Sequence, residues 1–353
     1  MVKKILKRYR IIAWLFLKNR RILRFLIWTI CIPPLYLFNL FFMKLDKIFL
    51  KKCHETKIID PIFIMGHPRS GTSTLQSIMA TSNQTCTFNT WEILFPSIIQ
   101  QNLFYPVLKL LQIFKLQQIQ SGEKGHKIMI DETEEDEGIF LHHLDTEILT
   151  LFCPWLLIDN KYSHYGFRMG WNDHRNDKSS ITFYHNAIKR LLYKTGKKTF
   201  VAKCNPGVFR IQSILKTFPD AKIIYLVRQP EKSIQSFLSF HKKFIGDLLT
   251  KNEQQQYYKA KYRWSKKFYD YFEDIKEIIP TENLLIVPFK NLINEDKHFK
   301  KELEKFTGLN LKMQSNKNYQ KNHHNNSLKE FDLAREDILH DLQYIGKKYL
   351  QNN

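Results

Sequence analysis

The chain has 353 residues, 43% of them hydrophobic and 25% charged, which is enough apolar material for a large core and excludes an intrinsically disordered protein. The formal charge is +21, but residues 1–52 hold thirteen Lys and Arg against Asp46 alone, so the remaining +9 suits a multiply anionic small ligand as well as a nucleic acid. Five cysteines without C-x-x-C spacing predict neither a zinc site nor a disulfide framework.

The N-terminal segment contains an uncharged apolar run, residues 25–43, that is about long enough to cross the hydrocarbon core of a bilayer. Pro33 and Pro34 disfavour a straight helix, and basic residues flank the run, so a spanning anchor competes with a helix in the plane of the membrane. A third interpretation is an aromatic-rich helix pair packed on the domain or on a partner chain. We expect residues 1–57 to form a basic, membrane-associating segment and residues 58–353 to form one domain.

The side of the membrane on which this domain lies depends on the mode of anchoring. The excess of Lys and Arg before residue 25 favours a cytoplasmic N-terminus, so a spanning anchor would place the domain outside the cytoplasm. An in-plane anchor would leave the domain in the cytoplasm. The expected location is therefore at a membrane, on a side that the sequence does not choose.

The next element predicts a phosphate-binding loop. An apolar run of strand character, Ile62–Met65, stops at Gly66 and is followed by a loop that enters a helix near Thr72. Gly66 and Gly71 let the backbone turn tightly, so that several N–H groups and the helix N-terminus face one anion. The spacing is that of a nucleoside-triphosphate loop, but Thr72 and Ser73 stand where such loops have Lys and then Ser or Thr. The predicted ligand is phosphate-like but not ATP.

The middle of the chain is predicted to be mostly helical, and its acidic run favours a helix start. Asp131 and Glu134 lie at capping-box spacing just before an apolar periodic stretch. A metal site would need converging ligands, and nothing in this run requires them, so no metal is expected. The elements expected here are a helix over 72–82, a short strand over 85–88, and a helical stretch over 91–116 interrupted at Pro96 and Pro106.

The second half alternates strands with helices, which indicates a parallel sheet. Ligands of such sheets gather at the carboxyl ends of the strands, and Gly66, Lys203 and Arg228 all lie at such ends. The expected elements are strands over 198–203, 221–227 and 283–287, helices over 208–218, 254–279 and 331–349, and a loop over 317–326.

Six segments of the chain form a recognisable pattern: Gly66–Thr72, Thr90–Glu92, Glu134–Asp136, Phe218–Ala221, Arg228–Ser236 and Ser327–Leu333. In their order and spacing these segments resemble the sulfotransferases that use 3′-phosphoadenosine 5′-phosphosulfate (PAPS). The resemblance is closest to the group that includes the tyrosylprotein and many bacterial sulfotransferases, and it covers about residues 58–345. It implies an α/β fold, the P-loop three-layer arrangement of a central parallel sheet flanked by helices, with the N-terminal hydrophobic helical segment added.

The resemblance also assigns the donor site. The residues that it implies for the 5′-phosphosulfate are Arg69, Ser70, Gly71, Thr72, Ser73 and Thr74. Arg228 and Ser236 would bind the 3′-phosphate, which is the feature that distinguishes this donor from ATP. An Arg fork and a hydroxyl on a helix suit a phosphate dianion.

Three residues are implied as catalytic. Lys203, assisted by Arg69, would stabilise charge on the leaving phosphate, because in-line transfer through a loose transition state depends on positioning and charge stabilisation. A hydroxyl acceptor also needs a general base. The cytosolic branch has a His where this chain has Asn205, so Glu92 is the expected base. A structural role for Glu92, capping or pairing nearby, stays open.

The expected reaction is transfer of a sulfuryl group from PAPS, a co-substrate used without a metal, to a hydroxyl or amine of an unidentified glycan, lipid, protein or small molecule. One alternative is a P-loop kinase-like phosphotransferase, which Thr72 disfavours. A second alternative is a non-catalytic basic membrane or nucleic-acid-binding protein, suggested by the +12 charge of residues 1–52. We expect a membrane as a partner and no nucleic acid.

Overall fold

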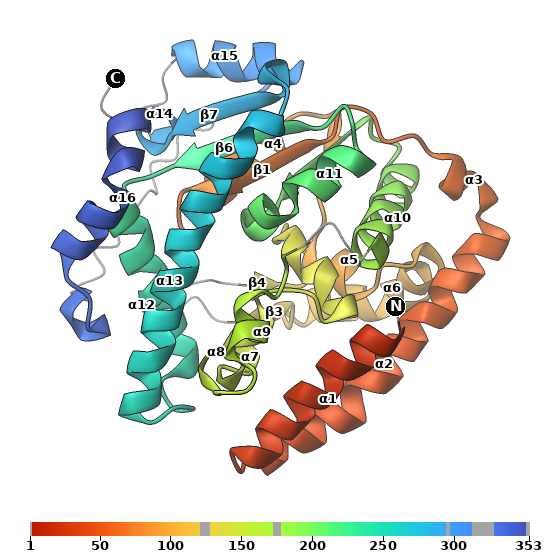
Figure 1. Ribbon diagram of the computed structural model, residues 1–353. Helices are drawn as coiled ribbons and strands as arrows, with labels where there is room; N and C mark the ends of the chain where they lie inside the picture. Colours follow the sequence, from red (N-terminus) through yellow and green to blue (C-terminus); the bar gives the residue numbers. More distant parts are fainter. Residues whose placement is uncertain (1, 121–127, 172–177, 294–296, 313–327, 351–353) are drawn as a thin grey trace. The chain divides into compact units, whose positions relative to one another are not determined.

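The computed structural model describes residues 2–120, 128–171, 178–293, 297–312 and 328–350 (Figure 1). These residues form two compact units. The sheet unit contains residues 59–86 and 197–353, and the N-terminal unit contains residues 1–58 and 87–196. The expected loop over 317–326 lies outside the described residues.

The sheet unit contains a five-stranded sheet in the order β2-β5-β1-β6-β7, and every pair of neighbours is parallel. The strands form where the sequence has short apolar runs, which suits strands that are buried on both faces. Ile64 of the first strand lies opposite Lys203, and Gly66 lies opposite Leu226. The carboxyl ends of β5, β1 and β6 therefore meet at one edge, as predicted. The strands are β1 (Ile62–Gly66), β2 (Thr85–Cys86), β5 (Thr199–Lys203), β6 (Lys222–Val227) and β7 (Leu284–Pro288).

Helices cover both faces of this sheet, because alternate residues of its strands point to opposite sides. On one face, Ile64 and Leu226 belong to a buried cluster with side chains of α4, α14 and α15. On the other face, the ring of Tyr225 stacks on that of Phe272 in α13 at 3.5 Å. The predicted three-layer α/β fold is therefore confirmed. The helices of this unit are α4 (Thr72–Met79), η3 (Asn205–Arg210), α11 (Ile211–Thr217), α12 (Pro230–Ile245), α13 (Lys251–Ile275), η4 (Lys276–Ile278), η5 (Thr281–Asn283), α14 (Phe289–Ile293), α15 (Lys297–Thr307), η6 (Leu328–Phe331) and α16 (Arg335–Tyr349).

The N-terminal unit is mostly helical, with one short antiparallel pair of strands, β3 and β4, that the sequence pattern did not predict. In Figure 1 its first two helices run side by side as a long pair. The elements of this unit are α1 (Val2–Lys18), α2 (Ile22–Phe49), α3 (Lys51–Glu55), α5 (Thr90–Leu94), α6 (Ile98–Ile113), β3 (Gln118–Gln120), β4 (Ile128–Met129), η2 (Asp136–His143), α7 (Leu149–Phe152), α8 (Trp155–Ile158), α9 (Ser163–Phe167) and α10 (Lys178–Thr195).

Two local expectations in this unit are wrong. The helix after the acidic run begins at Asp136, not near Asp131, and Asp131 instead accepts a hydrogen bond from Gln112 Nε2 at 2.9 Å. The carboxylate of Glu134 accepts from the next backbone N–H, so the predicted capping box does not form. Pro106 lies inside α6 and does not end it.

The second helix is long and apolar enough to cross a membrane, by length and composition alone. Pro33 and Pro34 both lie inside α2, which continues through them over 28 residues. Residues 2–58 belong to the same compact unit as residues 87–196. The expected division of the chain after residue 57 stays a prediction.

Candidate functional site

The loop between β1 and α4 passes through two positions that have no room for a side chain. Gly66 has φ +158°, and a Cβ there would lie 2.7 Å from the carbonyl oxygen of Leu226 on the neighbouring strand. Gly71 has φ +95°, and its Cβ would lie 2.5 Å from the ring of Phe289. Glycine relieves both restrictions, so the loop can turn from the strand into the helix.

The loop presents donors at the start of α4. Gly71 stands at the N-cap position in the left-handed conformation, and the first N–H groups of a helix have no acceptor within the helix. The hydroxyl of Ser70 is buried and has no hydrogen-bond partner among the described residues. Thr72 is buried, Thr74 is half-buried and Ser73 is exposed. Backbone N–H groups, an unsatisfied hydroxyl and the helix dipole together suit an anion.

Two arginines and a serine come together beside this loop. Arg69 has φ +73°, a strained value for a residue with a side chain, and its Nε donates to Ser236 Oγ on α12 at 3.2 Å. Arg228, just after β6, donates from Nη1 to the carbonyl oxygen of Arg69 at 2.8 Å. Its guanidinium also lies 4.7 Å from the centre of the Phe289 ring. The structure therefore brings Arg228 and Ser236, which the resemblance assigned to one phosphate, together with Arg69, which it assigned to the other.

Lys203 approaches the same loop from the other neighbouring strand. It is the last residue of β5, its side chain is buried, and its Nζ donates to Ser73 Oγ at 3.1 Å. Because β5 and β6 flank β1, Lys203 and Arg228 bracket the loop that carries Arg69. Three cationic side chains thus lie at one edge of the sheet, where the field of each adds to that of the helix N-terminus.

His67 is a residue of the loop to which the sequence analysis gave no role. It is fully buried, its ring stacks on Tyr269 at 5.2 Å, and its Nδ1 lies 2.9 Å from the carbonyl oxygen of Pro68. A carbonyl only accepts, so Nδ1 carries the proton, and the unprotonated Nε2 lies 2.8 Å from the hydroxyl of Ser265, which also lies 3.0 Å from the carbonyl oxygen of Lys261. Burial lowers the pKa of His67 to about 3, so the ring is neutral and ties the loop to α13.

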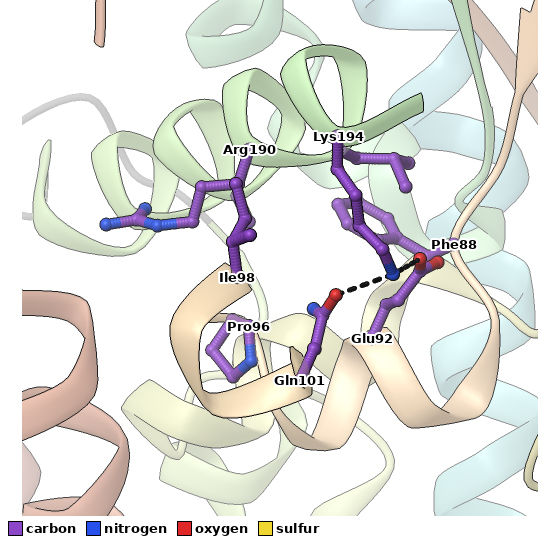
Figure 2. A pocket seen from close by; sticks show the side chains of 9 residues that line it. Phe88, Glu92, Pro96, Ile98, Gln101, Arg190 and Lys194 are labelled. Atoms are coloured by element: carbon purple, nitrogen blue, oxygen red, sulfur yellow. Dashed lines mark hydrogen bonds and ion pairs between the residues drawn. The ribbon is translucent and has the colours of Figure 1, made fainter. Parts of the chain in front are cut away.

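Glu92 belongs to the N-terminal unit, where it serves two structural roles. It forms a capping box with Asn89, since its carboxylate accepts from Asn89 N at 3.2 Å while the Asn89 side chain accepts from Glu92 N. Its Oε1 accepts from Lys194 Nζ at 3.0 Å, and the same ammonium donates to Gln101 Oε1 at 2.8 Å. Figure 2 shows these three side chains converging in a small pocket, whose other lining residues are Phe88, Pro96, Ile98, Ala187, Arg190 and Leu191.

The buried Glu92 is therefore both a helix cap and an ion-pair partner, which are the roles that the sequence left open beside that of a base. The other predicted site residues all belong to the sheet unit. Among the described residues, no group of three or more His, Cys, Asp or Glu side chains is placed to hold a metal ion.

Comparison with known proteins identifies the family of this chain. The profile of the Sulfotransferase family matches residues 61–313 of this chain. Two curated relatives, the omega-hydroxy-beta-dihydromenaquinone-9 sulfotransferases Stf3 of Mycobacterium bovis and Mycobacterium tuberculosis, are each 26% identical over 201 residues. That match covers 55% of this chain and 49% of each relative, so the chain spans about half the length of the curated relatives it matches.

Two solved structures share the fold. Sulfotransferase STF1 from Mycobacterium tuberculosis H37Rv has a TM-score of 0.65 at 16% identity, over 85% of this chain and 80% of that one. Sulfotransferase STF9 from Mycobacterium avium has a TM-score of 0.66 at 14% identity, over 88% of this chain and 81% of that one. At such identities the likeness concerns the fold alone.

Proposed function

The chain belongs to the sulfotransferase family, and from this premise we propose that it transfers a sulfuryl group from PAPS to a hydroxyl or amine of its acceptor. The observation that carries the proposal is the cluster of Arg69, Arg228 and Ser236 beside the loop that begins at Gly66, with Lys203 on the neighbouring strand. A nucleotide with phosphates at two separate places needs two groups of donors, and the donors gathered at this edge of the sheet support the proposal.

The donor site divides into two parts. The residues proposed for the 5′-phosphosulfate are Arg69, Ser70, Gly71, Thr72, Ser73 and Thr74. The buried, unsatisfied hydroxyl of Ser70 supports this part, because a bound anion would give that group its acceptor. Arg228 and Ser236 are proposed for the 3′-phosphate, which a guanidinium and a hydroxyl can bind through charge-assisted hydrogen bonds.

The catalytic roles proposed for Lys203, Arg69 and Glu92 are based on the charges of their side chains. When bound, the donor supplies an activated sulfuryl group and a phosphate that leaves. Lys203 and Arg69 would stabilise negative charge on that phosphate, and this kind of stabilisation is usually the largest single contribution to such catalysis. Glu92 is proposed to take the proton of the acceptor at its carboxylate. For that role its carboxylate must exchange a donor that it now binds, either Lys194 or the N–H of Asn89, for the acceptor hydroxyl.

The acceptor is proposed to be a hydroxylated lipid. The curated relatives are named as sulfotransferases of omega-hydroxy-beta-dihydromenaquinone-9, a menaquinone derivative that carries a hydroxyl group. The apolar N-terminal segment of this chain would bring the enzyme to the surface where such a molecule is dissolved. We accordingly propose a membrane-associated enzyme.

Calorimetry on the full chain tests the donor. We expect 3′,5′-adenosine bisphosphate to bind at nanomolar to micromolar concentration and AMP to bind far more weakly, because only the first carries the 3′-phosphate. Equal affinity for the two nucleotides would overturn the proposal. Incubation with PAPS labelled in its sulfuryl group and a membrane lipid extract would then show whether a lipid becomes labelled.

A further inference from the structure

The exposed apolar side chains of this protein are concentrated in two segments. Among the described residues, fifteen large exposed apolar side chains lie in residues 2–49 and eight lie in residues 103–119, whereas six are scattered over the remainder. Single exposed apolar residues are ordinary, but a contiguous concentration marks a surface that contacts a membrane or another protein. Both segments belong to the N-terminal unit.

Within the first segment, six of the exposed apolar side chains form a stripe along α2. Its members are spaced by three, four or seven residues, so they lie on one face of the helix. Each is more than half exposed: Leu23 71%, Ile27 53%, Ile30 65%, Leu37 64%, Phe41 56% and Ile48 59%.

The second segment forms a similar stripe along α6. Its members, again at helical spacing, are Leu103 58%, Val107 47%, Leu110 53% and Phe114 67%, and the last of these follows the helix directly. The two helices pack against each other, and the rings of Phe38 and Phe104 lie 5.7 Å apart between them. The stripes are therefore on neighbouring helices of one compact unit.

Polar contacts hold both ends of α2 to this unit. Near its start, Arg24 donates to the carbonyl oxygen of Phe152 at 3.2 Å. Near its end, the fully buried Asp46 forms an ion pair with Arg190 on α10 at 2.8 Å and accepts from Ile98 N at 3.0 Å. Arg24 and Asp46 are 22 residues apart, which is about 33 Å along a helix and close to the thickness of a hydrocarbon core. A helix spanning the bilayer could not keep both contacts with one folded unit.

Hydrogen bonds also hold the middle of α2 to the N-terminal unit. Asn39 is buried, its amide donates to the carbonyl oxygen of Leu94 at 3.0 Å, and its carbonyl accepts from Gln100 Nε2 on α6 at 2.7 Å. Removing this amide from its partners into hydrocarbon would leave donors and acceptors unpaired, at a cost of several kcal/mol. The polar face of α2 therefore packs against the rest of the N-terminal unit, and the exposed apolar stripe on the opposite face is available for another contact.

We propose that the stripes of α2 and α6 together form a monotopic contact surface, which lies in the plane of one leaflet of an anionic lipid bilayer. The apolar residues would enter the boundary between headgroups and acyl chains, as amphipathic helices do. The neighbouring charge fits this occupant, since residues 1–52 carry thirteen Lys and Arg, and Lys44 and Lys47 are exposed on α2 itself. This deepens the membrane placement proposed above but does not depend on sulfuryl transfer, because its readout is lipid contact.

Depth measurements on the full chain distinguish this arrangement from a spanning helix. The variants Leu23→Cys, Leu37→Cys, Ile48→Cys and Leu110→Cys, each in a Cys31→Ser background, would carry a fluorophore in vesicles with lipid-attached quenchers. We expect all four to report a similar, shallow depth. A spanning α2 would place Leu37 deepest, with Leu23 and Ile48 about 15 to 20 Å nearer the two surfaces, and would leave Leu110 in water. That result would overturn the proposal.

A binding assay tests the role of α6. The double variant Leu110→Gln/Phe114→Gln should weaken binding to vesicles of phosphatidylglycerol and phosphatidylcholine at least about tenfold, because two apolar side chains no longer enter the lipid. The matched control, Ile278→Gln/Leu339→Gln, changes two exposed apolar residues of the sheet unit and should bind like the parent. Equal binding of the α6 variant and the parent would overturn the proposal.

The wild-type protein supplies a further control. Cys31 on α2 is exposed, whereas the other four cysteines are buried, so a soluble maleimide should label Cys31. Vesicles should slow this labelling. If labelling is already slow without lipid and the protein is a dimer in solution, a second copy of the chain covers the stripe. The proposal that the stripe contacts lipid would then be wrong. Binding of 3′,5′-adenosine bisphosphate, measured on the same samples, separates these outcomes from failure of the donor site.

Discussion

The guanidinium of Arg228 donates a hydrogen bond to the carbonyl oxygen of Arg69 at 2.8 Å. This bond joins the end of β6 to the loop between β1 and α4 at Arg69, the one non-glycine residue of that loop with a strained backbone (φ +73°). Arg69 in turn donates to Ser236 on α12. The two arginines therefore order each other before a ligand arrives, which reduces the conformational entropy that binding must overcome.

Replacing Arg228 with alanine should weaken binding of 3′,5′-adenosine bisphosphate by about 10- to 100-fold. The variant loses a charge-assisted contact with the 3′-phosphate and also releases the Arg69 carbonyl. Titration calorimetry measures the loss, and affinity for AMP should change less because AMP has no 3′-phosphate. Arg335→Ala is the control, because Arg335 is exposed on α16. If Arg228→Ala bound both nucleotides like the parent, the 3′-phosphate assignment would be wrong.

Replacing Glu92 with glutamine separates a base from a structural residue. Glutamine also fits the third position of a capping box, so the fold should be kept, while the group that accepts the proton is removed. We expect kcat to fall about 10²- to 10⁴-fold, with donor affinity unchanged.

A second capping box provides the matched control. Glu253 occupies the same position at the start of α13, with Thr250 as its N-cap residue. Glu253→Gln should leave kcat and the pH profile at parent values. If Glu92→Gln also turned over like the parent, Glu92 would only cap α5 and pair with Lys194, and another group would have to be the base.

Lys203→Met keeps much of the length of the side chain and removes its charge. We expect kcat to fall at least about 10²-fold, with a smaller effect on binding of 3′,5′-adenosine bisphosphate, because the charge acts on the phosphate as it leaves. Lys222→Met is the control, since Lys222 begins β6 at the opposite end of the strands. Steady-state kinetics and calorimetry on both variants test this. A loss of affinity as large as the loss in kcat would show that Lys203 only binds the donor.

The sequence predicted the parallel sheet, and the position of Gly66, Lys203 and Arg228 at the ends of its strands, because the signals for them are local. Apolar runs that end in glycine or a cation mark β1, β5 and β6, and parallel pairing then brings their ends together. The pairing of Glu92 with Lys194 was not predictable, because 102 residues separate the partners. The buried position of His67 depends likewise on Ser265 in a distant helix.

The orientation of α2 relative to a membrane could not be predicted from the sequence, for a different reason. Length and hydropathy could not choose between a spanning and an in-plane helix, since both need an apolar run. The burial of Asn39 and Asp46 against the rest of the unit favours the in-plane helix. Their partners Gln100 and Arg190 are distant in the chain, so the sequence pattern did not indicate these contacts. Pro106 was expected to interrupt a helix, but it lies inside α6, so its low helix propensity alone did not decide where this helix ends.

The buried histidines predict a loss of stability in acid. Burial lowers the pKa of both His67 and His241 to about 3, whereas an unfolded chain binds these protons near pH 6.5. Below about pH 6.5 the unfolded state therefore binds more protons, and the free energy of unfolding should fall by about 1.4 kcal/mol per pH unit for each ring until the native state is protonated near pH 3.

The variant His241→Phe tests that slope. It leaves the hydroxyl of Tyr257 without its present partner and so lowers stability at every pH, but it should also remove one of the two proton-binding steps. Urea unfolding at several pH values between about 4 and 7 measures both effects. An unchanged slope in this variant would mean that His241 is not neutral in the native state.

The buried pair of Asp46 and Arg190 predicts how α2 is held. Asp46 accepts from Arg190 Nε, Ser97 Oγ and the N–H groups of Ile98 and Ile99, so it both pairs with a buried charge and caps α6. Asp46→Ala leaves the guanidinium unpaired, and we expect a loss of about 3 to 5 kcal/mol in urea unfolding, with faster hydrogen exchange in α2 and α6. Asp46→Leu/Arg190→Met should recover part of the loss by removing both charges, and only part because the N–H groups of Ile98 and Ile99 lose their acceptor. If the single variant were as stable as the parent, this pair would not hold the helix, and α2 would lack the strongest of the contacts that keep it from leaving its unit to span a bilayer.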